Sequence, residues 1–185
     1  PHLTWQADIQ GTDLDPSVFF AEWPGHFAGK LTTKGEWAES PTATFQLTGL
    51  QGTLRNYPLS GHGEMRLQGQ HLVIPQFLLT SGGSTLTIKG DATSTLDFPF
   101  SLHSGNLGEL WPGAGGNLDL KGRVRGTPER PTLDLHLGAN RLQFERNTVD
   151  HLTVTGKGVV AADGPVQVDI EMNKATLGTF RLDRG

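Results

Sequence analysis

Histidine is the residue type in this sequence with the broadest chemistry, because imidazole binds metals and exchanges protons near neutral pH. No two histidines share the i, i+2 or i, i+4 spacing that places a pair of metal ligands on one face, and no HExxH motif occurs. The spacing therefore predicts histidines on solvent-facing strands or turns, with no metal site. Their positions are His2, His26, His62, His71, His103, His136 and His151.

Three further motifs could begin a catalytic or phosphate site, and each has a simpler explanation. Ser60 and His62 place a hydroxyl near an imidazole, but no GxSxG motif surrounds any serine, so we expect a turn there. The glycine-rich run 113–116 leads into alternating strand residues rather than a helix, which predicts a hairpin turn instead of a phosphate loop. Asp13 and Asp15 form a carboxylate pair, yet Asp15 precedes a proline, as at the start of a helix. The motifs predict neither an enzyme nor a bound cofactor.

Composition excludes several classes of protein. The 185 residues carry 15 Lys+Arg against 19 Asp+Glu, a formal charge of −4, so no basic excess points to nucleic acid. No apolar run approaches the roughly 20 residues of a membrane-spanning helix. With no cysteine, the chain has neither disulfides nor thiolate metal ligands. The 25 glycines and 11 prolines indicate many turns and favour an all-β fold.

Apolar and polar residues alternate along most of the chain. Such alternation places every apolar side chain of a strand on one face. It is clearest in residues 3–9, 43–47, 96–102, 133–137 and 166–172, and each run ends at a glycine, proline or polar turn. The pattern predicts about 12 to 14 short strands in an antiparallel meander. Helical periodicity is confined to one or two turns within 15–23 and 105–111.

With no helix to cover it, the apolar face of such a sheet must close into a barrel, pack in a sandwich, or line an open trough. An internal repeat favours the trough, since repeats build elongated stacks. Glu22-Trp23-Pro24-Gly25 recurs 88 residues later as Leu110-Trp111-Pro112-Gly113. We therefore predict an elongated, curled antiparallel sheet with an apolar concave face. Residues 1–185 would form one segment of a longer chain, with repeats at about 14–106 and 107–185.

The order of the motifs between residues 81 and 131 resembles a known family. A strand ending in glycine, 81–90, is followed by L-G-E-L-W-P-G at 107–113 and by G-N-L-D-L-K-G-R-V-R-G-T-P-E-R-P at 116–131. This arrangement is similar to the repeat of the TamB family and its AsmA-like relatives. The first repeat matches more loosely, through the motifs at 14–16, 22–25 and 52–55. The resemblance covers about residues 10–158.

The resemblance implies a position in the envelope of Gram-negative bacteria. Members of the family are anchored in the inner membrane and extend through the periplasm as a curled sheet whose apolar groove passes phospholipid acyl chains towards the outer membrane. They also act with TamA, an outer-membrane barrel, in the assembly of autotransporters and other outer-membrane proteins. The implied partners are thus phospholipid, a TamA-like barrel and nascent outer-membrane proteins.

Candidate groove residues are those in the apolar phase of the clearest strands. Two alternatives remain: a scaffold that binds unfolded outer-membrane strands at a sheet edge, and a closed β-sandwich adhesin or sugar-binding module. Trp23 and Trp111, at equivalent repeat positions, are predicted to plug the trough or to pack a short helical turn onto the sheet. The predicted groove residues are Phe45, Leu47, Ile74, Leu86, Ile88, Phe98, Phe100, Leu118, Leu120, Leu133, Leu135, Leu137, Leu152, Val154, Val168 and Ile170.

Overall fold

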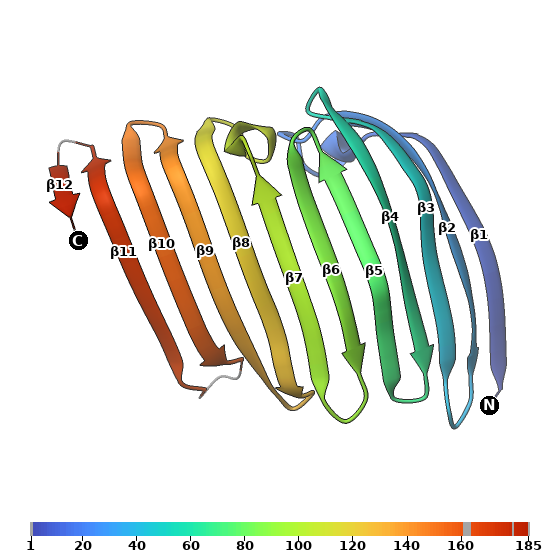
Figure 1. Cartoon of the computed structure of the whole chain (residues 1–185). Helices are drawn as coiled ribbons and strands as arrows, with labels where there is room; N and C mark the ends of the chain where they lie inside the picture. Colours follow the sequence, from blue (N-terminus) through green and yellow to red (C-terminus); the bar gives the residue numbers. More distant parts are fainter. Residues whose placement is uncertain (1, 161–163, 179, 185) are drawn as a thin grey trace.

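The chain forms one antiparallel sheet of 12 strands whose order in space is their order in sequence (Figure 1). The computed structural model describes residues 2–160, 164–178 and 180–184. The strands are β1 (Leu3–Leu14), β2 (Gly25–Trp37), β3 (Thr42–Leu54), β4 (Tyr57–Gln68), β5 (His71–Ser81), β6 (Ser84–Ala92), β7 (Leu96–Ser104), β8 (Ala114–Thr127), β9 (Arg130–Phe144), β10 (Asn147–Val159), β11 (Val166–Leu177) and β12 (Phe180–Arg184). The predicted all-β meander is confirmed.

The pairing register carries the apolar phase from strand to strand. Residues directly opposite in an antiparallel pair point to the same face, so a row of partners identifies that face. One such row crosses β7 to β11 without interruption, and every member is aliphatic: Leu102, Leu120, Leu137, Val154 and Ile170. Alternation within each strand and register between strands therefore combine into a single apolar face.

The opposite face is polar and contains ion pairs between neighbouring strands. His103 on β7 lies 2.7 Å from the Asp119 carboxylate on β8, and His71 on β5 lies 2.9 Å from Asp91 on β6. The guanidinium of Arg123 hydrogen-bonds the Asp97 carboxylate across β7 and β8. These histidines lie on strands or at their ends, as predicted. Exposed pairs of this kind stabilise a sheet only slightly, so they favour the register more than the fold.

The apolar face has no second layer among the described residues. The only apolar side chains there that are buried are Leu59 and four alanines, at 43, 92, 139 and 175. A closed sandwich or barrel would bury many large aliphatic side chains, and a barrel would also pair its end strands. Here β1 pairs with β2 alone, and β12 pairs with β11. The sandwich alternative is therefore wrong for this chain.

In the described part of the chain, helix is limited to two single turns of 3₁₀ type, η1 (Pro16–Val18) and η2 (Leu107–Glu109). Both begin at a capping side chain: Asp15 accepts the backbone N–H of Ser17 at 2.9 Å, and Asn106 accepts that of Gly108 at 3.0 Å. The interpretation of Asp15 as a cap is thus confirmed, and its hydrogen bond from Ser17 lowers its pKa.

Two other sequence motifs have their place in the sheet. Ser60 and His62 lie inside β4 rather than in the expected turn, because the hairpin glycine is Gly69, after the strand ends. The run 113–116 is a turn at Gly113, whose φ is +74°, and then the start of β8. No helix follows it, so no phosphate loop is formed.

The Asp97–Arg123 pair predicts an acid dependence of stability. The hydrogen bond from Arg123 lowers the pKa of Asp97, so the folded chain binds fewer protons than the unfolded chain as the carboxyl titrates. This contribution is complete above the unfolded pKa and is lost as the pH falls through the folded value, below about pH 4. We expect Asp97→Asn to flatten the pH dependence of the melting temperature in that range. Arg123→Gln should flatten it equally, and an unchanged profile in both variants would contradict the assignment.

Candidate functional site

The apolar face of the sheet is the candidate functional site. The register places every residue predicted for the groove on this one face, because their rows of cross-strand partners connect. By strand they are Phe45 and Leu47 on β3, Ile74 on β5, Leu86 and Ile88 on β6, Phe98 and Phe100 on β7, Leu118 and Leu120 on β8, Leu133, Leu135 and Leu137 on β9, Leu152 and Val154 on β10, and Val168 and Ile170 on β11.

Phe77 and Leu79 were missing from that prediction because a bulge changes the phase of β5. Strict alternation from Ile74 would place Gln76 on the apolar face. The register shifts between Ile74 and Phe77, so Phe77 and Leu79 point to this face instead. The bulge follows Pro75, which cannot donate a ladder hydrogen bond. Proline inside an apolar run was the available signal for this change.

A hollow of about 480 Å³ lies on the apolar face across β2 to β6. Its lining is almost wholly apolar, with Leu31, Phe45, Met65, Phe77 and Ile88 from five successive strands. A second hollow, of about 570 Å³, lies further along the same face, on β9 to β11. Volumes of 300 to 1,000 Å³ are usual for sites that bind small apolar ligands.

The end of the apolar face at β11 is open to solvent. Val166, Val168 and Ile170 are 71%, 53% and 56% exposed. Large exposed apolar patches in a folded protein mark places where another molecule binds. The face therefore has the character of a binding surface rather than of a folding core.

One rim of the apolar face is closed by a polar bridge that we call the rim clasp, formed by Arg55, Ser84 and Glu109 with η2. Arg55, in the β3–β4 turn, donates from Nη1 to the carbonyl oxygens of Gly108 at 3.1 Å and Glu109 at 3.3 Å. The Glu109 carboxylate accepts the N–H of Gly83 at 2.7 Å and the hydroxyl of Ser84 at 3.2 Å. Figure 1 shows η2 at the upper end of the sheet, between β7 and β8.

The rim clasp joins parts of the chain that a flat sheet would hold far apart. Four strand spacings of about 4.8 Å would place the β3–β4 turn and η2 about 20 Å apart in a flat sheet, farther than an arginine side chain reaches. The clasp lies on the side of the apolar face, since Ser84 and its hydrogen-bond partner Ser104 share that face with Leu86 and Leu102. Both serines are buried beneath it, at 2% and 0% exposure.

The two tryptophans at equivalent repeat positions differ. Trp23 is half-buried, and the Arg55 guanidinium lies 5.9 Å from the centre of its ring. Trp111 is 54% exposed, so it does not plug the sheet, and that alternative of the prediction was wrong. The Arg55 side chain that lies near Trp23 also donates to the backbone of η2, two to three residues before Trp111.

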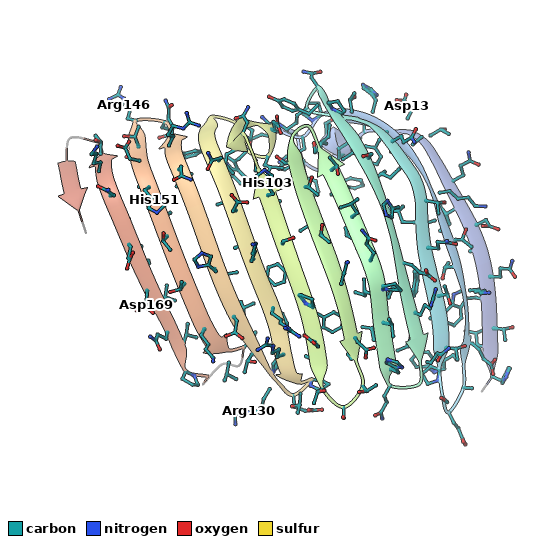
Figure 2. All side chains as sticks on the ribbon, in the orientation of Figure 1. Asp13, His103, Arg130, Arg146, His151 and Asp169 are labelled. Carbon is teal, nitrogen blue, oxygen red and sulfur yellow. The ribbon has the colours of Figure 1, made fainter. Side chains whose placement is uncertain are left out.

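Polar residues line a hollow of about 510 Å³ on the opposite face, across β8 to β11, with Lys121, His136 and Asp169 among them. Figure 2 shows its labelled residues dispersed, with Asp13 and Arg146 at one rim, Arg130 at the other, and His103, His151 and Asp169 along the strands. Within the described part of the chain, no three His, Asp or Glu side chains form a group that could hold a metal ion. The apolar face is therefore the feature on which a functional proposal can rest.

The whole chain, residues 1–185, matches the family model for the N-terminal domain of TamB. The chain belongs to the TamB family. The resemblance found in the two Trp-Pro-Gly repeats is thereby confirmed and extended to residues outside 10–158. No solved structure matches this TamB-family chain. In the described ranges, none of its helices has the length and apolar character to cross a bilayer.

The rim clasp predicts a local change in Arg55→Ala. Hydrogen bonds from a guanidinium to two carbonyls contribute about 1 kcal/mol or more when partly buried. Their loss should release η2, and with it the Glu109 carboxylate that accepts the Gly83 N–H. We expect faster hydrogen exchange at the Gly83 amide. Arg146→Ala, at the same rim on the β9–β10 turn, is the matched control and should leave that amide unchanged. Equal exchange in both variants would refute the clasp.

Proposed function

We propose that this chain is a periplasmic segment of a TamB-like protein whose apolar face binds and conducts phospholipid acyl chains between the inner and outer membranes. The observation that carries the proposal is the unbroken apolar face with no second layer over it in the described residues. The curled sheet would form a trough with this face inside. Its role would be physical, as a non-enzymatic conduit that contributes to outer-membrane biogenesis.

Acyl chains suit this face on energetic grounds. Each CH₂ group moved from water to an apolar surface gains about 0.8 kcal/mol, with no directional contact required. A row such as Leu102, Leu120 and Leu137 offers similar aliphatic contacts at each strand. An acyl chain that moves from one strand to the next would therefore lose and gain similar contacts. Specific polar partners would instead hold the lipid at one place.

Membership of the TamB family supports the remaining parts of the proposal. The protein would belong to an inner-membrane-anchored chain that spans the periplasm. Its partners would be phospholipid and, through the full-length protein, a TamA-like outer-membrane barrel. This assignment concerns the whole protein, whereas the present chain supplies one stretch of apolar face.

Native mass spectrometry with lipid extraction tests the proposal on the chain purified under mild conditions from bacteria. We expect phospholipid to co-purify with the unmodified chain. Ile88→Arg and Leu135→Arg place a charge on the apolar face and should abolish lipid binding, because an unpaired charge there opposes apolar contact. The retained β circular dichroism would show that the sheet still forms.

The matched controls change the neighbouring residue on the polar face of the same strands. Thr87→Arg on β6 and His136→Arg on β9 should keep their lipid, since Thr87 and His136 alternate with Ile88 and Leu135. In the full-length protein, Ile88→Arg and Leu135→Arg should also abolish function. Normal function of a folded Arg variant would contradict the proposal that the apolar face binds lipid. Absence of lipid from the unmodified chain would contradict it too.

A second candidate function rests on the same apolar face, which could hold the apolar side chains of unfolded strands beside an edge of the sheet. We propose as the alternative that the chain is a scaffold for outer-membrane proteins and autotransporters, acting with a TamA-like barrel. Photocrosslinkers at Gln6 on β1 and at Ile88 distinguish the two functions. Crosslinks to nascent barrel strands, with none to lipid, would favour the scaffold.

A further inference from the structure

Aromatic residues on the apolar face are paired across strands with glycines. Phe77 on β5 lies directly opposite Gly63 on β4, and Phe100 on β7 lies opposite Gly122 on β8. A methyl group placed on Gly63 would lie 2.5 Å from Cδ2 of Phe77. One placed on Gly122 would overlap the Phe100 ring. Each ring thus occupies the space beside the sheet that only glycine leaves empty.

The same arrangement occurs at two further places. The ring of Phe98 on β7 occupies the space above Gly90 on β6, and the ring of Trp5 on β1 occupies that above Gly35 on β2. A large ring over a cross-strand glycine compensates for the packing that a glycine in a strand lacks. Recurrence at four places makes this a feature of the apolar face between β1 and β8.

The position of each aromatic ring determines how far it projects from the apolar face. Side chains on a strand stand roughly perpendicular to the sheet, so an aromatic ring with a Cβ beneath it would project outward. Over a glycine, the ring lies along the sheet instead. Gly63 and Phe77 both line the hollow of about 480 Å³, so their packing sets the space available in that hollow.

We infer that Gly63, Gly90 and Gly122 are specificity-determining positions that recess the aromatic rings and keep the apolar face wide enough for a two-chain lipid. This inference rests on the proposed acyl-chain function. The glycines act as positioning residues: the groups in contact with lipid would be the rings and their aliphatic neighbours. With a raised ring, the apolar face would keep room for one acyl chain and lose room for a second chain beside it.

Gly63→Ala tests the inference most directly, because Gly63 has no positive φ that alanine would strain. Binding is measured with two probes that carry the same fluorescent acyl chain: a phosphatidylethanolamine with two chains, and the free fatty acid. We expect Gly63→Ala to weaken phosphatidylethanolamine binding about tenfold, or about 1.4 kcal/mol, and fatty-acid binding less. Gly122→Ala should act in the same direction.

Two controls separate ring position from loss of stability. Gly138→Ala on β9 is the control for a glycine-to-alanine change on the polar face, since Gly138 alternates with Leu137 and no atom lies within 4 Å of a methyl group placed there. It should bind both probes as the unmodified chain does. Phe77→Leu, added to Gly63→Ala, removes the ring that alanine displaces and should restore phosphatidylethanolamine binding.

Thermal unfolding of each variant is recorded alongside the binding measurements. Unchanged selectivity between the two probes in folded Gly63→Ala would overturn the inference. So would an equal loss of both probes that Phe77→Leu does not restore, because the glycine would then act on strand stability alone. An unmodified chain that binds neither probe would instead overturn the proposed function itself, and the inference with it.

Discussion

The apolar face without a second layer is the constraint on which the structure depends. A twisted sheet with one apolar face normally buries that face against helices or another sheet. Here the described chain offers only η1 and η2, each a single turn, and the large aliphatic residues stay partly exposed. Hydrogen bonding between neighbouring strands must therefore supply the order that a packed core supplies in other proteins. Polar pairs on the opposite face, such as Asp97 with Arg123, reinforce the same register.

The shape of the rim and the height of the aromatic rings above the sheet depend on different contacts. The rim clasp holds the β3–β4 turn to η2 and fixes the curl at one rim through Arg55 and Glu109. The cross-strand glycines act on a smaller scale, since they decide whether a ring such as Phe100 lies along the sheet. The first contact joins distant strands at one rim, and the second acts between neighbouring strands along the apolar face.

Much of this fold could be predicted from the alternation of apolar and polar residues alone. Such alternation indicates a β-strand when glycines and prolines end each run. The face of each predicted groove residue followed from the same period. Phe77 was missed because a bulge after Pro75 changes the phase within β5. The rim clasp could not be predicted, since Arg55 and Glu109 meet only through the curl of the strands between them. The exposure of Trp111 is a tertiary outcome of the same kind.

The sequential order of the strands has a consequence for how this protein can be made. Every strand pairs only with its neighbours in sequence, so each new hairpin closes a short loop at small entropic cost. No strand must wait for a distant partner. The sheet can thus grow from its first strand as the chain emerges through a narrow pore, each arriving strand adding to the edge left by the previous one. Such growth tolerates great length, because the next addition depends on the last strand and not on the size of the whole.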